Sequence, residues 1–167
     1  AGLSEISAGF VPALPPVPYP LFAQVIAFFR SFLQQGRDCE AFVQIYWDKQ
    51  ERQYILHVPP QSVGPAFVHA RLDAREFSPE RYIAYMEIHS HHAMRAFFSA
   101  EDDRDERAAR VYVVAGRLDR FYPQIKARIC CGGVFQPIDP ALVIEPPAQP
   151  DFPSGWPAAV TREPSGK

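Results

Sequence analysis

The sequence predicts an α/β domain of the α+β type: a mixed β-sheet sandwiched between an N-terminal helix and a short helix that follows a histidine-bearing strand. Three observations predict this class. Apolar residues recur at helical spacing over 21–33, β-branched and aromatic runs fill much of 41–135, and Ser99 begins a short acidic segment. The chain has 167 residues, of which 47% are hydrophobic, so it can bury one core.

Proline marks the edges of the domain. Of the 18 prolines, five lie in the first 20 residues and six in the last 22. We therefore predict a proline-rich segment at 1–20, extended and lying against the domain, and a folded unit at 21–145. The tail at 146–167 is rich in Pro, Ala, Ser and Gly, and is predicted to be loosely held or disordered, with Trp156 as the one residue that docks.

The first half of the unit reads as one helix followed by short strands. The helix covers 21–33 and ends at Gly36. Two strands at 41–47 and 52–58 are joined by the polar stretch 48–51, which predicts a hairpin. A weaker strand is predicted at 63–72, and a short helical turn at 78–80, with Ser78 as its cap.

The second half begins with a strand that runs from Ile83 or Tyr85 into His91. A short acidic helix begins at Ser99. Strands at 111–117 and 124–135 follow, with 141–145 as a third candidate. The order of the strands in the sheet does not follow from this pattern.

Two histidines and one aspartate form the candidate metal site. Residues two apart on a strand project from the same face, so His89 and His91 lie side by side. Two imidazoles suit zinc, which takes nitrogen ligands at about 2.0–2.1 Å in a tetrahedral site. Asp102, on the next element, can supply the third protein ligand and leave the fourth position to water.

This segment resembles the signature of the JAMM (JAB1/MPN) metalloproteases of the bacterial type. That signature is His-x-His, seven residues, Ser, two residues and Asp, which His89, His91, Ser99 and Asp102 match in register. The stretch around Ser99 also resembles the JAMM proteins of a bacterial gene cassette called PRTRC, which have E1-like and ParB-like partners. Outside these positions the likeness covers about 21–145 in outline only.

The resemblance implies a mechanism. The family needs an upstream glutamate at the start of a strand after the first helix, and Glu40 stands there. One zinc ion per chain would activate water, Glu40 would act as general base and then acid, and the Ser99 hydroxyl would stabilise the oxyanion. Family members cut peptide or isopeptide bonds at the C-terminal tails of ubiquitin-like or sulfur-carrier proteins, so such a protein or peptide is the expected substrate, with an E1-like (ThiF-like) protein as a further partner.

Several residues near the candidate metal site allow two interpretations. The family usually has proline after the second histidine, where this chain has His92, which we interpret as supporting or surface rather than a ligand. Glu87 either orients a ligand or is solvated, and Cys39 either lines the site or is a buried, inert thiol. The acidic run 101–106 is interpreted as a solvated helix face. Little room remains at 103–136 for a long insertion, which predicts an open cleft.

Other classes fit less well. A net charge of −2 and no basic stripe argue against a nucleic-acid partner, and no apolar stretch is long enough to span a membrane. Three cysteines, two of them adjacent, make a poor disulfide framework, so a cytoplasmic location is expected. Cupin-type sites need a glutamate where Arg95 and Ala96 stand, and zinc deaminases need a Cys-x-x-Cys pair. The alternative that stays open is a non-catalytic, MPN-like scaffold domain.

Overall fold

A six-stranded mixed sheet, in the order β2-β1-β5-β6-β7-β8, forms the centre of the structure. The structure is a computed structural model, which describes residues 10–161 apart from 38 and 74. Along the chain the elements are α1 (Tyr19–Gln34), β1 (Phe42–Asp48), β2 (Gln53–His57), β3 (Gln61–Gly64), β4 (Phe67–Ala70), β5 (Tyr82–Ser90), α2 (Ala100–Asp105), β6 (Arg110–Gly116), β7 (Gln124–Cys131), β8 (Val134–Ile138) and two short 3-10 turns, η1 (Pro140–Leu142) and η2 (Pro157–Ala159).

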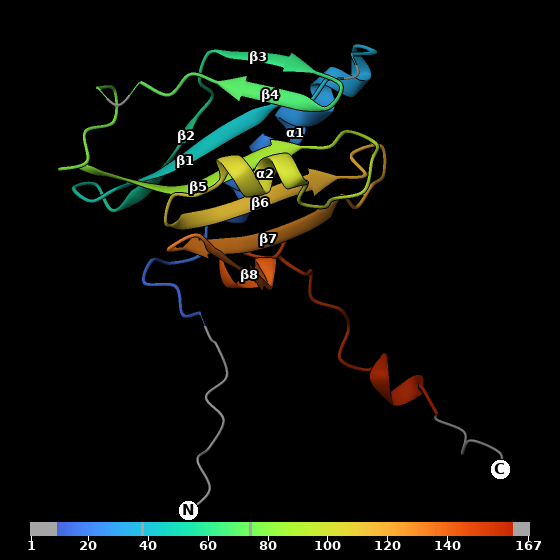
Figure 1. The fold of residues 1–167 in the computed structure, drawn as a ribbon. Helices are drawn as coiled ribbons and strands as arrows, with labels where there is room; N and C mark the ends of the chain where they lie inside the picture. The colour runs from blue at the N-terminus through green and yellow to red at the C-terminus, as the bar shows by residue number, and fades with distance from the viewer. Residues whose placement is uncertain (1–9, 38, 74, 162–167) are drawn as a thin grey trace, which may run out of the picture.

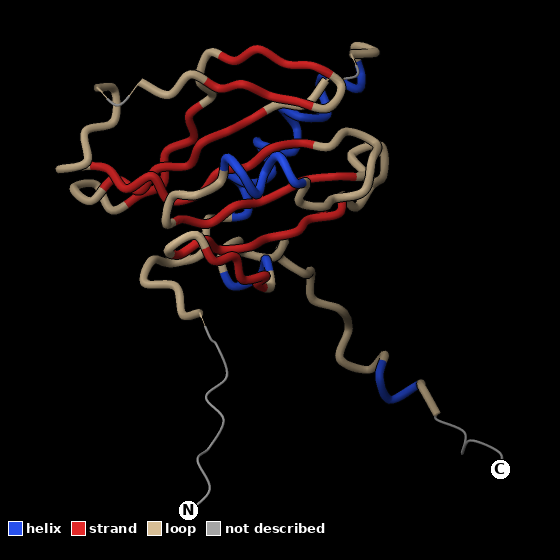
Figure 2. Tube along the Cα trace, in the orientation of Figure 1, coloured by secondary structure: helices blue, strands red, loops and turns tan. Residues whose placement is uncertain are grey.

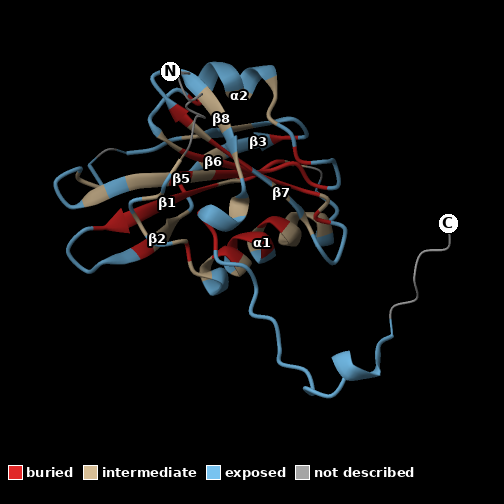
Figure 3. Cartoon of the chain, turned by 90° about the horizontal axis from the view of Figure 1, so that it is seen from below, coloured by how far each residue is buried: buried red, intermediate tan, exposed pale blue. Residues whose placement is uncertain are grey.

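The two helices cover opposite faces of this sheet. In Figure 1, α2 crosses in front of β5 and β6 while α1 lies behind the sheet. Figure 3, turned by 90°, shows α2 and α1 on either side of the strands. The tube in Figure 2 shows the strands in red lying side by side in the centre of the domain. The predicted α+β class, with a mixed sheet between two helices, is confirmed.

The core lies between α1 and the sheet. The helix buries one face because its apolar residues recur every three or four positions. Along each central strand alternate residues join the same core, as the period of two requires. The buried members of this cluster include Phe22, Val25, Ile26, Phe29, Val43, Ile45, Met86, Ile88, Val111, Val113, Ala115 and Ala127.

The opposite face of the sheet carries the polar residues that lie under α2. Glu87 and His89 alternate with the core residues of β5, and Arg128 alternates with those of β7. β5 pairs in parallel with β6, so the chain must cross over between them, and α2 lies on this crossover. The crossover therefore brings α2 over the end of β5, where the two histidines lie.

The proline-rich segment, where it is described, packs against the domain. Val17 is fully buried and forms a parallel bridge with Ile144. The Tyr54 hydroxyl donates to the carbonyl of Pro15. Phe10 and Leu14 pack on the edge of the core. Helix α1 begins at Tyr19, which lies inside the predicted 1–20 segment, and residues 1–9 lie outside the described part of the chain.

Three strand predictions were wrong in detail. The stretch 63–72 is not one strand: it forms the β3–β4 hairpin together with residues 61 and 62, because the chain turns at Pro65. The stretch 124–135 is likewise divided into β7 and β8 by Gly132 and Gly133, whose φ values of 59° and 79° need glycine. The stretch 141–145 is no strand: residues 141 and 142 belong to η1, which Asp139 caps, and Ile144 forms an isolated bridge with Val17.

The other elements agree with the prediction. α1, the β1–β2 hairpin, β5, α2 and β6 lie within one to three residues of the predicted bounds. The short helical turn predicted after Ser78 is present, because the N–H groups of Arg81 and Tyr82 both donate to the Ser78 carbonyl, and it does not extend into a helix. From Gln149 to Thr161 the described tail is exposed, and Trp156 is 64% exposed, with Phe152 as its stacking partner. The predicted docking of Trp156 on the domain is therefore wrong. No helix within 10–161, as far as it is described, is long and apolar enough to cross a bilayer.

Candidate metal centre

His89, His91 and Asp102 converge on one point. The two Nε2 atoms of the histidines lie 3.2 Å apart, and Asp102 Oδ1 lies 3.5 Å from His89 Nε2. All three ligand atoms are within 4.8 Å of one another. Ligands at about 2.0–2.1 Å from a tetrahedral centre are separated by roughly 3.3 Å, so two of these spacings already match a zinc site.

Glu40 lies beside the cluster because two elements hold its backbone. Its N–H donates to the carbonyl of Gly64 on β3. Its neighbour Ala41 donates from its N–H to the Ser90 hydroxyl and accepts from the Ser90 N–H, both at 2.9 Å. The serine between the two histidines therefore fixes the start of β1 against the end of β5. Glu40 Oε1 comes to 3.7 Å from His91 Nε2.

The loop after His91 is fastened to the end of β6. His91 N–H donates to Ala115, and Arg117 N–H donates to Met94. Gly116 allows this approach, because an added Cβ would lie 2.4–2.6 Å from the backbone of residues 94–96. His92 has a φ of 47°, which proline cannot adopt. The departure from the family's usual proline thus coincides with a left-handed turn at this residue.

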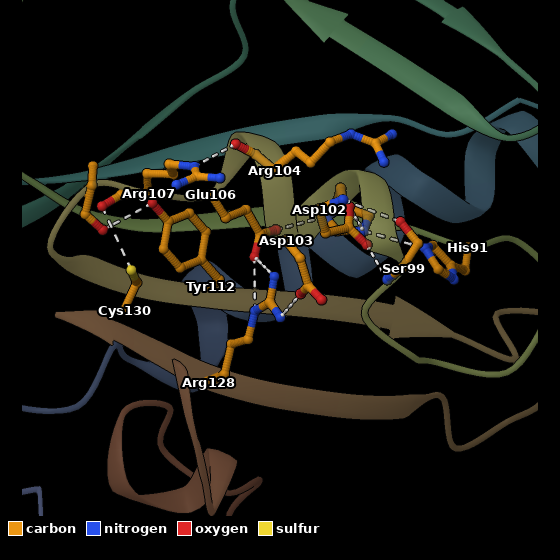
Figure 4. Close-up of polar contacts among 12 residues, drawn as sticks. His91, Ser99, Asp102, Asp103, Arg104, Glu106, Arg107, Tyr112, Arg128 and Cys130 are labelled. Atoms are coloured by element: carbon orange, nitrogen blue, oxygen red, sulfur yellow. Dashed lines mark hydrogen bonds and ion pairs between the residues drawn. The ribbon is translucent and has the colours of Figure 1, made fainter. Parts of the chain in front are cut away.

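Asp102 and Ser99 form the N-terminal cap of α2. The Ser99 hydroxyl accepts from Asp102 N–H at 3.2 Å, and Asp102 Oδ2 accepts from Ser99 N–H at 2.5 Å. Figure 4 shows Ser99 and Asp102 next to His91 at the start of the helix. One carboxylate oxygen therefore serves the capping box and the other faces the histidines. The structure is therefore compatible with both interpretations of this motif, as a helix cap and as the source of a metal ligand.

Burial governs the charge of the side chains around this point. It lowers the pKa of His89 to about 4, against an opposing effect of the Asp102 carboxylate. Burial also lowers the pKa of His91. Burial, with the charges of Asp102 and Glu101, raises the pKa of Glu40 to about 7. At neutral pH both imidazoles are therefore neutral, and Glu40 is poised to exchange a proton.

This donor set fits a zinc ion. Neutral imidazoles keep a lone pair for the metal, and their Nε2 atoms already face each other across a metal-sized gap. Asp102 adds a carboxylate oxygen, which completes three protein ligands of two kinds. Three protein ligands with an open fourth position are typical of catalytic zinc rather than structural zinc, which is closed by four.

The cluster lies in a cleft of about 490 Å³ that is lined by the β3–β4 hairpin on one side and by α2 on the other. Large apolar side chains stand at its rim: Phe67, Met94 and Phe97 are each 41–45% exposed. Phe97 also packs edge-on against the His91 ring. Residues 66–69 of the β3–β4 hairpin line the cleft. The 103–136 segment holds the end of α2, β6, β7 and the start of β8, and no long lid is described within it.

The structure places the residues that allowed two interpretations. Glu87 is partly buried, lines the cleft and pairs with Arg110. His92 is buried, and its carbonyl accepts from Leu118 N–H. Cys39 is half-buried, next to Glu40. His69 lines the cleft from β4, whereas His57 packs on Tyr46 and Phe77 away from it.

One interpretation of this region was wrong. The acidic run 101–106 is not a uniformly solvated face, because Glu106 is buried and receives two hydrogen bonds from Arg128. The sequence did hold a signal for this: Asp102 and Glu106 are four apart, which places them on the same face of a helix. Nothing in β7 singled out its partner Arg128, which is one of three polar residues, with Gln124 and Lys126, that alternate with apolar residues there.

The raised pKa of Glu40 predicts a pH-dependent stability in protein freed of metal by a chelator. The pKa is about 4.5 when unfolded and about 7 when folded, so the stability that the neutral carboxyl provides is present below pH 4.5 and lost as pH rises through 7. The advantage of Glu40→Gln over the parent in unfolding free energy should grow by about 2–3 kcal/mol from pH 4.5 to 8.5. Urea titrations at both pH values measure it. A difference that does not change with pH would contradict the argument.

A model of a known protein family matches the chain. The model of the family described as "Prok-JAB: Prokaryotic homologs of the JAB domain" matches residues 33–127, a stretch that holds Glu40, His89, His91, Ser99 and Asp102. No curated protein matches the chain. The match covers more than half of the 167 residues, from the end of α1 into β7. The chain therefore belongs to the family of prokaryotic homologs of the JAB domain.

Proposed function

We propose that the chain is a zinc-dependent hydrolase that cuts a peptide or isopeptide bond at the C-terminal tail of a ubiquitin-like or sulfur-carrier protein. The observation that carries this proposal is the His89–His91–Asp102 cluster, whose two histidines are buried, with the Glu40 carboxyl 3.7 Å from His91. A scaffold domain has no need for a buried carboxyl with a raised pKa beside three converging ligands.

Each side chain has a distinct task in this proposal. His89, His91 and Asp102 would hold the zinc ion. When bound, zinc supplies Lewis acidity, which makes a neighbouring water more acidic and polarises the carbonyl of the bond to be cut. Glu40 takes the proton from that water and delivers it to the leaving amine, a role that suits a buried carboxyl whose pKa is raised by burial in the metal-free site.

Ser99 is placed to donate a hydrogen bond. Its hydroxyl oxygen accepts from Asp102 N–H, and a hydroxyl that accepts one hydrogen bond keeps its proton for another. Ser99 also lines the cleft. In the proposed reaction its O–H donates to the carbonyl oxygen as negative charge develops there, a contribution often worth about 3–4 kcal/mol.

The shape of the cleft supports an extended substrate. β4 forms one wall, and within the described residues its ladder pairs only with β3, so its other edge faces the cleft. An extended tail can add to such an edge through main-chain hydrogen bonds. The exposed apolar side chains of Phe67, Met94 and Phe97 would pack on side chains of that tail.

The test is cleavage of a ubiquitin-like protein that carries a reporter peptide at its C-terminus. The zinc-loaded protein should release the reporter, lose this activity on chelation and regain it when zinc is added. A protein that holds one zinc ion per chain yet releases no reporter from ubiquitin-like or sulfur-carrier fusions would instead be the scaffold. A protein that binds no zinc would refute the metal site itself.

A further inference from the structure

A second layer of charged side chains lies behind the metal cluster. Arg128 reaches from β7 to the underside of α2, where it meets two acids of that helix (Figure 4). Its Nε and Nη2 donate to the same oxygen of Glu106, Oε2, at 2.9 and 2.6 Å. Its Nη1 donates to Asp103 Oδ1. One buried guanidinium thus holds both acids.

The arginine is itself fixed on both sides. Its guanidinium carbon lies 4.0 Å from the ring centroid of Phe98 and 3.9 Å from that of Phe135. Arg128 is 5% exposed and Glu106 is 7% exposed. A guanidinium stacked between two rings and bonded to two carboxylates has little freedom to move. Arg128 and Phe135 lie beyond the part of the chain that the family model matches, which ends at residue 127.

The second oxygen of Glu106 faces a metal ligand. Glu106 Oε1 lies 3.8 Å from Nδ1 of His89, whereas Nε2 of the same ring faces His91 and Asp102. A histidine that gives Nε2 to a metal must carry its proton on Nδ1, and a carboxylate beside Nδ1 stabilises that tautomer. A separation of 3.8 Å is closed by a small movement of the ring or bridged by water.

From this geometry we infer that Glu106, held by Arg128, is a positioning residue for the metal centre: it fixes the Nδ1–H tautomer and the ring orientation of His89. The presence of a metal in this inference rests on the proposed function. The roles of Glu106 and Arg128 rest on the contacts described above. Loss of a carboxylate that supports a metal-bound histidine typically weakens metal binding by about 10–100-fold.

Glu106→Gln is the sharpest variant because the outcome follows from donor and acceptor roles. Arg128 can only donate, so the new amide must turn its oxygen to Arg128 and its NH₂ toward His89. That NH₂ would donate to Nδ1 and so favour the proton on Nε2, the atom that the metal needs. The side chain keeps its size, which limits any change in packing.

The chain offers a matched control at the other end of the sheet. Arg81 donates from Nε and Nη2 to one oxygen of buried Asp48 at 3.0 and 2.6 Å, the same fork geometry as Arg128 and Glu106. Asp48→Asn neutralises the carboxylate of this pair and Arg81→Lys removes its planar fork, both away from the histidines, although the Arg81 side chain is 42% exposed where that of Arg128 is 6%. Arg128→Lys accompanies Glu106→Gln, because an ammonium group cannot reproduce the planar fork that holds Glu106.

Two measurements test the inference on the full chain. Competition with a chromophoric chelator gives the zinc affinity. This affinity should fall about 10–100-fold in Glu106→Gln and by less in Arg128→Lys. In the controls Asp48→Asn and Arg81→Lys it should change less than about twofold. Long-range ¹H–¹⁵N spectra of the metal-free protein report the tautomer of His89, which should move from Nδ1–H toward Nε2–H in Glu106→Gln alone.

The outcomes separate the two proposals. Equal losses of zinc affinity in the Glu106 and Asp48 variants, or an unchanged tautomer in Glu106→Gln, would overturn the role of Glu106. A parent protein that binds zinc but hydrolyses nothing would refute the proposed function and leave the positioning role intact. If the parent binds no zinc, the tautomer measurement still decides whether Glu106 controls the His89 ring.

Discussion

Glu40→Gln should lower the turnover of a tail-cleavage substrate by about 10²–10⁴-fold while zinc stays bound at one ion per chain. The carboxyl is 6% exposed and its Oε1 lies 3.7 Å from His91 Nε2, so it stands beside the metal ligands, where it can take up a proton from a neighbouring water. An amide of the same size fills the same space but carries no exchangeable acid proton. Steady-state kinetics with metal analysis of the same sample measure both effects.

Glu51→Gln is the matched control for this variant. Glu51 is the other glutamate near β1, and it lies exposed in the β1–β2 turn. Its substitution should leave both turnover and zinc content unchanged. If Glu40→Gln hydrolyses at the parental rate, Glu40 has no role in proton transfer. If zinc is lost together with turnover, Glu40 is a ligand instead, which its 3.7 Å approach to His91 Nε2 would then explain.

The fold was predictable where a single segment carries its own pattern. Helix α1 and strands β1, β5 and β6 have continuous apolar periodicity, and they were placed within a few residues. The β3–β4 and β7–β8 hairpins were missed because the residues on both sides of each turn are strand formers. Nothing local separates one long strand from two short ones except Pro65 or the Gly132–Gly133 pair.

The candidate site likewise has a part that the sequence predicts and a part that it does not. His89, His91, Ser99 and Asp102 stand on one contiguous stretch at fixed offsets, so the period of the strand and the cap of the helix bring them together. The Glu106–Arg128 pair was not predictable, because it depends on β7 lying beside β6 beneath α2. That neighbour relation is set by the strand order, which periodicity does not contain.

Asp102→Asn and Ser99→Ala should each impair a different property: the first lowers zinc affinity and the second lowers stability. In Asp102→Asn the side-chain oxygen can still accept from Ser99 N–H, so the cap persists and the unfolding free energy changes little. The anionic oxygen that faces His89 at 3.5 Å is lost, however. Zinc affinity should therefore fall more than about 100-fold, beyond the effect of losing a supporting carboxylate.

Ser99→Ala removes the other half of the capping box. The Asp102 N–H loses its acceptor, which should cost about 1 kcal/mol of stability, while the three ligands remain and zinc stays bound. Turnover should fall about 10²–10³-fold if the hydroxyl donates to the developing oxyanion. Chemical denaturation, chelator competition and kinetics on the two variants distinguish these patterns. If Ser99→Ala loses stability without any change in turnover, Ser99 acts only as a helix cap. If Asp102→Asn keeps full zinc affinity, the carboxylate is not part of the metal site, because a ligand that can be neutralised without cost does not bind the ion.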